Sequence, residues 1–280
     1  MSSASPSPTS PSSKSSSSSP APAVSRAVKI LAVLADAHGV EMSLADLARA
    51  VGAPKSSAFN VCLVLEEAQL ISRREFGYTL GRRTVELGGA YLSGFDQVRE
   101  FYRVCSSSPV LATELVQLSV LDGTDVVYLA RHEGSTPLRL SAGVGDRFPA
   151  SVTAVGNALL MALSPDDVAA RYASLDALPV RTSRSTRTVA ELQDKLAAAR
   201  TRGYALDRSE VFPNVIGIAM PVPARNPGEN ALAIGVSVIG PREGFDVPPE
   251  QLTAIVDALR EAVRQLSNPM SRDALQESRA

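Results

Sequence analysis

The sequence of 280 residues contains no tryptophan, only two cysteines and only two histidines. Two cysteines allow one disulfide at most, and two histidines leave no cluster with the spacing of metal ligands. No segment approaches the roughly 20 consecutive apolar residues of a membrane helix. We therefore expect no structural disulfide, bound metal, cofactor or membrane span, and we expect a cytoplasmic protein.

The first 20 residues contain 12 serines, four prolines and one lysine. Because this composition cannot bury enough apolar surface to fold, residues 1–24 are expected to be a disordered tail. The segment also lacks the apolar run of a signal peptide and the arginines of a transit peptide. We expect a second tail over residues 269–280, and two modest domains between the tails.

Residues 43–81 have the pattern of two short helices joined by a tight turn. The first helix has apolar residues at the spacing i, i+3, i+4 and i+7, at Leu44, Leu47, Ala48 and Val51. Ser43 is a suitable N-cap, Gly52 can end this helix in the left-handed conformation, and Pro54 favours the start of another. The second helix is expected to begin near Lys55 and to bury apolar side chains at Phe59, Cys62, Leu63 and Leu70.

Two flanking segments extend this pattern to a winged helix-turn-helix. Upstream, a further helix is predicted from apolar residues at Ala27, Ile30, Leu31 and Leu34, which complete a three-helix core. Downstream, residues 71–80 are predicted to form a short hairpin that turns near residues 75–77. We therefore assign residues 25–83 to a DNA-binding domain. A small helical subdomain with a solvated polar face is the alternative.

The polar face of the second helix supplies candidate DNA contacts. Small or amide side chains lie close to its N-terminus, where a recognition helix in the major groove meets phosphates and base edges. Asn60 can pair with an adenine, and arginines on the hairpin can contact the phosphate backbone. The predicted DNA contacts are Lys55, Ser56, Ser57, Asn60, Arg73, Arg74 and Tyr78.

Charge is unevenly distributed along the chain. Residues 25–85 contain eight Lys and Arg against six Asp and Glu, whereas residues 86–280 contain 19 against 23. The predicted DNA-binding part is therefore the basic part, but only weakly so. One copy should bind DNA with modest affinity, which favours a homo-oligomer in which each copy adds phosphate contacts.

The remainder of the chain has a mixed pattern. Residues 84–108 are predicted to be a helical linker, interrupted by glycines at 88, 89 and 94. Further along, strands are expected at residues 116–121, 125–131, 215–222 and 231–239, with helices interspersed and a last helix near residues 252–266. Residues 109–268 are therefore predicted to form an α+β domain with a central antiparallel sheet.

Two of these strands have small residues on one face. The small residues are Gly217 and Ala219 on one strand, and Ala233, Gly235 and Ser237 on the other. Small side chains leave space beside a sheet for a ligand, but they also accommodate a bulky helix. Both interpretations stay open at this point.

Taken in order, these segments resemble the IclR family of bacterial transcriptional regulators. In the first part the resemblance is carried by SRAVKILAVL, SLADLARAVGAPKSSAF and YTLG. In the second part it is carried by LDGTDVVYLAR, RFPASVTAVGNALL, RTRGYALDRSE, IAMPVPA and VSVIGP. The resemblance covers residues 25–266. It implies a winged helix-turn-helix, a linker helix and a GAF-like effector-binding domain, in dimers or dimers of dimers that bind operator DNA.

The resemblance also implies a small-molecule effector, typically an organic acid or an aromatic catabolite. The implied contacts are the backbone amides of Ala154 and Val155, which lie near a helix N-terminus that can hold an anion, together with Asp207 and Ser237. Gly217 and Ile239 belong to the same set as departures, because many members have a cysteine and a serine there.

Two further departures concern polar residues. Asn157 replaces a usual lysine. Together with the replacements at Gly217 and Ile239, it removes polar or charged groups from the implied pocket, and Gly217 also adds room. These changes predict a larger and less polar effector than a two-carbon or three-carbon acid. Asn60 stands where many members have arginine, so the operator should differ from theirs.

Two other functions compete with this interpretation. An enzyme built on the sheet domain is disfavoured because no G-x-S-x-G elbow is present and His132 is the only histidine there. We therefore expect no catalytic residues. A regulator controlled by a protein partner, without a small ligand, is the second alternative.

Overall fold

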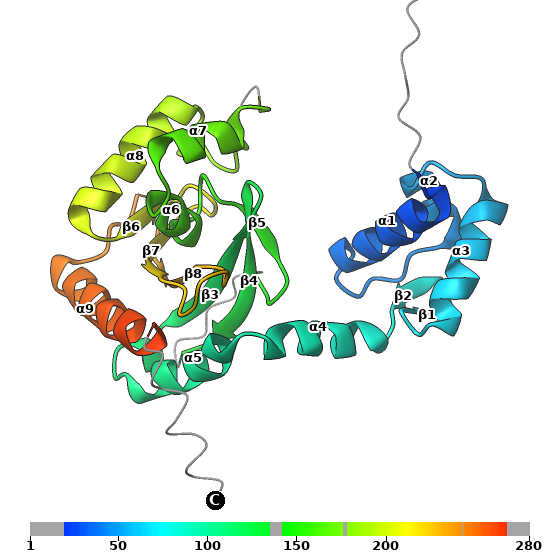
Figure 1. Ribbon diagram of the computed structural model, residues 1–280, viewed down its shortest axis with the longest axis horizontal. Coiled ribbons are helices and arrows are strands. Elements are labelled where there is room, and N and C mark those ends of the chain that lie inside the picture. Colours follow the sequence, from blue (N-terminus) through cyan, green and yellow to red (C-terminus); the bar gives the residue numbers. More distant parts are fainter. Residues whose placement is uncertain (1–19, 135–141, 176–177, 243, 268–280) are drawn as a thin grey trace, which may run out of the picture. The chain divides into compact units, whose positions relative to one another are not determined.

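Residues 20–134, 142–175, 178–242 and 244–267 are described by the computed structural model (Figure 1). The chain divides into two units, residues 1–91 and residues 92–280. Of the two predicted tails, residues 1–19 and 268–280 lie outside the described residues. The first tail was expected to reach residue 24, but a helix already begins at Pro22, because proline suits the first turn of a helix.

The first unit consists of short helices followed by a two-stranded hairpin. Its elements are α1 (Pro22–Asp36), α2 (Leu44–Ala50), α3 (Lys55–Glu67), β1 (Ile71–Arg73), β2 (Tyr78–Leu80) and most of α4 (Arg83–Ser93). Ser43 caps α2 by accepting a hydrogen bond from the backbone N–H of Asp46 at 3.2 Å. Gly52 has a φ of +62° in the turn before α3. The predicted turn chemistry is therefore confirmed.

The core of the first unit gathers side chains from all three leading helices and the hairpin. Its buried members include Ile30, Leu34, Leu47, Val51, Cys62, Leu65, Ile71 and Tyr78. On α3 the buried face runs through Ala58, Val61, Cys62 and Leu65. The expectation that Leu63 is buried is wrong, since its side chain is 44% exposed. At about 100° per residue, Leu63 lies roughly 140° around the helix from Ala58.

The predicted linker is two helices rather than one. The first is α4, and Gly88 and Gly89 lie inside it. The second is α5 (Asp96–Ser107), and the chain is extended at Phe95 between them. The interruption therefore falls beside Gly94. Helix α5 packs into the core of the second unit through Phe101 and Val104.

The second unit is built on an antiparallel sheet. After a short 3₁₀ turn (Leu111–Thr113), its elements are β3 (Leu115–Asp122), β4 (Asp125–His132), β5 (Arg147–Pro149), α6 (Ala154–Met161), α7 (Pro165–Tyr172), α8 (Val189–Arg202), β6 (Ala205–Arg208), β7 (Val215–Val222), β8 (Leu232–Ile239) and α9 (Pro249–Leu266). Among the described residues the strand order is β5-β4-β3-β8-β7-β6. Every neighbouring pair is antiparallel, which confirms the α+β fold class.

The two faces of this sheet carry different side chains and different helices (Figure 1). Large residues such as Ile218 and Ile234 face a core shared with α5 and α9. Small residues such as Ala219 and Ala233 face a second core shared with α6, α7 and α8. The predicted alternation along β7 and β8 is therefore confirmed. In the described part of the chain, no helix combines the length and the apolar character needed to cross a membrane.

A buried ion pair fastens α5 within the second unit. Arg225, which follows β7, donates from Nη1 to Glu100 Oε1 at 3.1 Å, and its Nη2 contacts the other carboxylate oxygen. Arg225 Nε also donates to the backbone carbonyl of Leu266 at 2.8 Å. Both charged side chains are only 4% exposed. This contact joins α5, the segment after β7 and the end of α9.

Removing one partner of this pair should destabilise the second unit. We expect Arg225→Met to lower the free energy of unfolding by about 3–5 kcal/mol, because the Glu100 carboxylate stays buried without a partner. The double variant Glu100→Leu, Arg225→Met should recover most of the loss. Urea denaturation measures both. The matched control is Arg260→Met in the exposed pair with Asp257, which should cost less than about 1 kcal/mol. Equal losses at both sites would contradict the prediction.

Candidate functional site

The first candidate site is the exposed surface of α3 and the hairpin. Lys55, Ser56 and Asn60 are exposed near the start of α3. Arg73 and Arg74 are exposed on the hairpin. The structure therefore brings five of the seven predicted DNA contacts to one unit's surface in accessible positions.

Ser57 is half-buried and already has a partner. Its hydroxyl accepts a hydrogen bond from Arg26 Nη1 at 3.0 Å. Arg26 lies on α1, so sequence spacing within the helix-turn-helix did not identify it. The contact places a guanidinium group beside the predicted recognition face, where it adds positive charge.

Tyr78 is not available for a DNA contact. Its side chain is 4% exposed and belongs to the core of the first unit. Burial raises the pKa of its hydroxyl. The prediction is corrected because residues along a strand alternate between its faces, and β2 turns Tyr78 inward. Tyr78 supports the hairpin from the core instead of contacting DNA.

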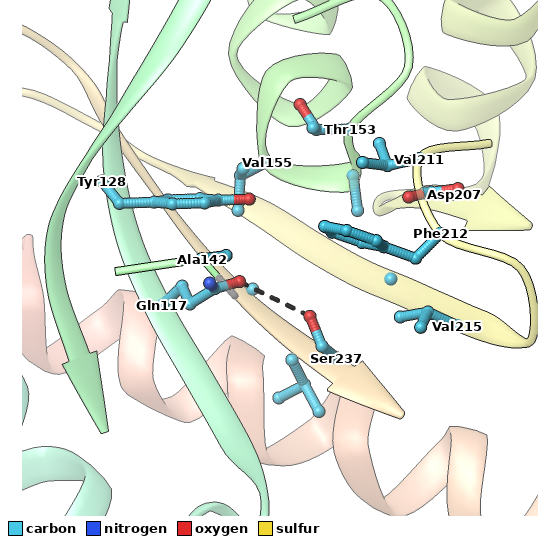
Figure 2. Close-up of a pocket in the computed structure, with 14 residues that line it drawn as sticks. Gln117, Tyr128, Ala142, Thr153, Val155, Asp207, Val211, Phe212, Val215 and Ser237 are labelled. Carbon is cyan, nitrogen blue, oxygen red and sulfur yellow. Dashed lines mark hydrogen bonds between the residues drawn. The ribbon is translucent and has the colours of Figure 1, made fainter. Parts of the chain in front are cut away.

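The second candidate site is a pocket in the second unit, between α6 and the small-residue face of the sheet (Figure 2). Its lining includes five of the six predicted effector contacts: Ala154, Val155, Asp207, Gly217 and Ser237. The central cavity has a volume of about 30 Å³, which is room for roughly two water molecules.

Ile239 does not line this pocket. It shares a face of β8 with Ser237 but pairs with Val215 two residues farther along the strand. On β8 the lining ends at Ser237, although Val215, the cross-strand partner of Ile239, does border the cavity. Its predicted role as an effector contact is therefore corrected.

Several lining residues had not been predicted from the sequence. Gln117, Tyr128, Thr153, Val211 and Phe212 all border the cavity. Figure 2 shows the Tyr128 and Phe212 rings on opposite sides of the site. Gln117 is a polar residue on the mostly apolar strand β3, which was a usable signal. Phe212 lies in the turn between β6 and β7, where the sequence pattern gave no signal of a pocket residue.

Polar groups converge on the cavity from the sheet and from α6. Ser237 Oγ and Gln117 Oε1 lie 3.4 Å apart in a hydrogen bond across β8 and β3 (Figure 2). Thr153 caps α6 by accepting from the backbone N–H of Gly156 at 3.1 Å. The backbone amides of Ala154 and Val155 open the helix, where N–H groups have no partner within the helix.

Gly217 does not enlarge the pocket. A Cβ atom on Gly217 would lie 2.7 Å from the Cβ of Ala154, and one on Gly235 would lie 2.7 Å from Val155 Cγ1. These glycines therefore let α6 approach the sheet. The expected gain of room is wrong, because the first turn of α6 occupies the space.

Asp207 is a buried carboxyl group at the pocket wall. Its side chain is 6% exposed, and Oδ1 accepts a hydrogen bond from the backbone N–H of Glu210 at 2.6 Å. Desolvation raises its pKa to about 8. A carboxyl group whose pKa lies in this range is largely protonated at neutral pH and is then able to donate a hydrogen bond.

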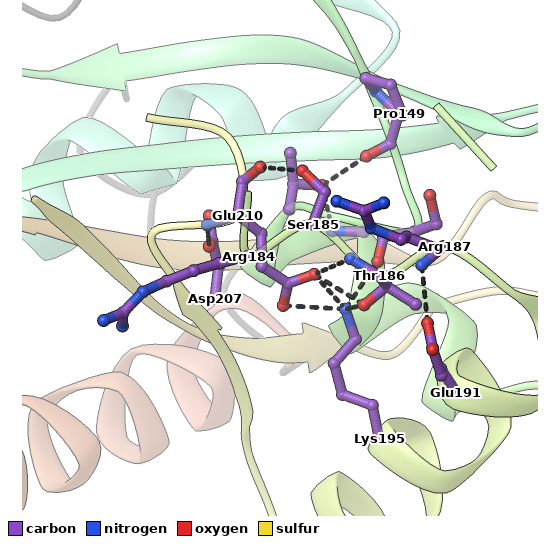
Figure 3. Close-up of polar contacts among 12 residues, drawn as sticks. Pro149, Arg184, Ser185, Thr186, Arg187, Glu191, Lys195, Asp207 and Glu210 are labelled. Atoms are coloured by element: carbon purple, nitrogen blue, oxygen red, sulfur yellow. Dashed lines mark hydrogen bonds and ion pairs between the residues drawn. The ribbon is translucent and has the colours of Figure 1, made fainter. Parts of the chain in front are cut away.

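A polar network behind Asp207 holds three segments together (Figure 3). Lys195 on α8 donates from Nζ to Glu210 Oε2 at 2.8 Å and to Thr186 Oγ1 at 2.7 Å. The same ammonium group donates to the backbone carbonyl of Ser151 at 2.7 Å, just before α6. The network thus links the start of α6 to Glu210, in the turn that follows Asp207 of β6 and carries Phe212.

Comparison with known proteins decides what these two sites belong to. A family model described as the bacterial transcriptional regulator IclR C-terminal domain matches residues 98–268, and one described as the IclR helix-turn-helix domain matches residues 23–75. The chain belongs to the IclR family. It is therefore a DNA-binding transcriptional regulator and not an enzyme.

Individual IclR-family proteins match over nearly the whole chain. A probable transcriptional regulator, SauR, of Cupriavidus necator is 33% identical over 248 residues, which cover 87% of this chain and 95% of the relative. The solved structure of an IclR-type regulator from Alicyclobacillus acidocaldarius has a TM-score of 0.74 at 21% identity, over 88% of this chain and 97% of that one.

A structure with a bound small molecule has the same fold. It is an IclR homologue from Microbacterium hydrocarbonoxydans in complex with 4-hydroxybenzoate. Its TM-score is 0.68 at 21% identity, over 88% of this chain and 98% of that one.

The raised pKa of Asp207 predicts a pH-dependent stability. The folded chain keeps this proton up to about pH 8, whereas the unfolded chain releases it near pH 4. The stabilisation is therefore complete below pH 4 and is lost as pH rises through 8. We expect Asp207→Asn, which cannot ionise, to reduce the fall in melting temperature between pH 5 and pH 8.5.

Scanning calorimetry across this pH range measures the effect. The control is Asp246→Asn, because the Arg208 side chain lowers the pKa of that exposed carboxyl and it stays ionised throughout the range. Its variant should follow the wild-type pH profile. The prediction would be contradicted if the melting temperature of Asp207→Asn depended on pH in the same way as that of the wild type.

Proposed function

We propose that this regulator binds its operator through α3 and the hairpin, and that a small organic acid bound in the α6 pocket changes that binding. The observation that carries the second part is the convergence of Asp207, Ser237 and the first turn of α6 on one cavity. The same cavity is bordered by the aromatic rings of Tyr128 and Phe212. Its chemistry suits a compact carboxylate with an apolar or aromatic body.

The proposed carboxylate site uses no Lys or Arg. None of the described residues that line the cavity is a cation, so an anion would be held by the backbone amides of Ala154 and Val155 at the positive end of α6. A protonated Asp207 supports this arrangement, since it donates a hydrogen bond where an ionised carboxylate would repel the ligand. The complex of the Microbacterium homologue with 4-hydroxybenzoate is consistent with such a ligand.

Ligand entry requires the pocket to open. A cavity of about 30 Å³ is too small for an organic acid beyond a few atoms. Phe212 is the half-buried side chain best placed to move, because it lies in a turn between Ser209 and Asn214, whose φ angles are +64° and +58°. A ligand that displaces Phe212 would also shift Asp207 and Glu210. The effector would then bind the state with Phe212 displaced more tightly than the state with Phe212 in place. Such a difference in affinity between two states is required if the effector is to change the affinity for DNA.

We also propose that the regulator acts in the cytoplasm as a homodimer or a dimer of dimers. In the first unit Val24 and Val28 on α1, and Val85, Leu87 and Tyr91 on α4, are large side chains that are more than half exposed. Apolar surface of this kind suits contact between copies. Two copies would also place two α3 helices on DNA, which offsets the weak positive charge of one.

The operator proposal predicts two different effects of substitution. Selection of duplexes from a random pool by the wild-type chain should yield an inverted repeat, with half-sites about one helical turn apart or a multiple of it. Arg74→Ala should weaken binding to every duplex about equally and lower the salt slope by about one phosphate. Asn60→Ala should leave the slope unchanged and relax the preference at one position of each half-site.

Fluorescence anisotropy at several salt concentrations separates these effects. The exposed Arg187, in the second unit, provides a matched control as Arg187→Ala. That variant should bind like the wild type. If the Arg74→Ala slope is also unchanged, the hairpin lies off the DNA.

The effector proposal predicts stabilisation by simple carboxylates. We expect at least one of glyoxylate, pyruvate, benzoate and 4-hydroxybenzoate to raise the melting temperature. At a ligand concentration 100 times the dissociation constant, binding should stabilise the folded chain by about 3 kcal/mol. The same compound should change the affinity for the selected operator. Ser237→Ala should lose the shift, whereas Ile239→Val on the same strand should keep it.

The ring-bearing and short acids also test the predicted size of the ligand. Tight binding of glyoxylate or pyruvate alone would overturn the expectation of a larger and less polar effector. No shift with any acid would favour the alternative of control by a protein partner.

A further inference from the structure

The tip of the hairpin carries an exposed aromatic side chain that none of the assigned DNA contacts explains. Phe76 lies between β1 and β2, and its side chain is 75% exposed. A phenylalanine in water forgoes the free energy that burial of its ring would supply. One exposed apolar residue is ordinary, so the significance of Phe76 depends on how the chain holds it.

The backbone around Phe76 is firmly braced. The N–H of Phe76 donates to Glu41 Oε2 at 2.8 Å, and the N–H of Arg74 donates to the carbonyl of Gly77 at 2.7 Å. Next to the tip, Met42 and Tyr78 exchange two backbone hydrogen bonds of 3.0 and 2.9 Å. The tip is therefore attached to the segment before α2, as a third strand would be.

Gly77 makes this attachment possible. A Cβ atom at this position would lie 2.2 Å from the backbone oxygen of Met42, so only glycine lets the two backbones meet. Phe76 precedes β2 in the turn, and its side chain is exposed whereas that of Tyr78 is buried. The ring is presented by a fixed framework and not by a loose loop.

Positive charge and α3 surround the same tip. A surface hollow is bordered by Phe59 of α3, by Arg73 and Arg74, by Glu75 and by Phe76 itself. The face of α3 assigned to DNA begins within this region, with Lys55 and Asn60 exposed on it. Glu75 and Glu41 also lie at this tip, so its charge is mixed. The two arginines and the position of the tip beside the α3 face assigned to DNA favour duplex DNA as the occupant over a protein surface.

Groove dimensions then fix where the ring goes. A helix with its side chains is about 10–12 Å across, and the major groove is about 12 Å wide. With α3 in that groove there is no space left for the hairpin, which must cross the phosphate backbone beside it. The neighbouring surface is a minor groove, where apolar side chains act as wedges.

We propose that Phe76 contacts the minor groove next to the half-site read by α3, with Arg73 and Arg74 on the intervening phosphates. The contact packs the ring against sugars and base edges and requires a groove that is free of the guanine amino group. It therefore adds a preference for A·T pairs outside the positions that α3 reads. This inference depends on operator binding by α3 and not on the effector proposal.

The test uses the duplex selected by the wild-type chain. Phe76→Ala should raise the dissociation constant roughly tenfold or more with an unchanged salt slope, because an apolar contact releases no counterions. Arg74→Ala should lower the slope instead. Phe76→Leu should keep most of the affinity. The matched control is Val40→Ala, an apolar side chain of the same unit that is 68% exposed, which should bind like the wild type.

A modified base identifies the groove. Replacing the flanking adenines with 2,6-diaminopurine adds an amino group in the minor groove and leaves the major groove unchanged. This change should weaken binding of the wild type and not of Phe76→Ala.

Two results would overturn the proposal: an unchanged dissociation constant for Phe76→Ala, or equal weakening of both proteins by diaminopurine. Failure to select any duplex would instead contradict operator binding itself. Because Phe76 is exposed, the variants should keep the wild-type melting temperature. An unchanged constant for DNA with a changed oligomeric state would assign the ring to a second copy of the chain and would also overturn the proposal.

Discussion

Helix α6 reaches the sheet only because β7 and β8 carry glycines beneath it. Side chains at Gly217 and Gly235 would collide with Ala154 and Val155, and the helix would be displaced outward. The close approach brings the first amides of α6 to the wall of a cavity that also contains Asp207 and Ser237. The pocket therefore depends first on missing side chains, and its polar groups become useful because the helix is near.

A second constraint keeps this arrangement in register. Lys195 satisfies Glu210, Thr186 and the carbonyl of Ser151 with one ammonium group. Among the described residues, Asp207 forms no ion pair, and its Oδ1 accepts a hydrogen bond from the backbone N–H of Glu210. Glu210 is therefore paired with a cation, whereas burial raises the pKa of Asp207 to about 8. The difference explains how an acidic residue can border a pocket proposed for an anion.

The first unit uses the same device at its hairpin. Gly77 permits contact between two backbones, and Tyr78 fills the core beneath them, so a hairpin with strands of only three residues has a defined tip. Isolated two-stranded hairpins are marginally stable in water. Here the bridge to Met42 and the packing of Tyr78 supply the missing support. In both units, glycine allows a close contact between two elements that holds a candidate site in place.

Local chemistry determined much of this protein in advance. The cap at Ser43, the turn at Gly52 and the alternation along β7 and β8 were readable because each depends on a few neighbouring residues. Long-range contacts decided the rest. Tyr78 belongs to the core, α6 occupies the space beside Gly217, and Ile239 does not line the cavity. Each outcome depends on which elements pack together. Phe212 and Lys195 in the second unit, and Arg26 in the first, lie far along the chain from the residues they join, and only the folded chain brings each of them to its own site.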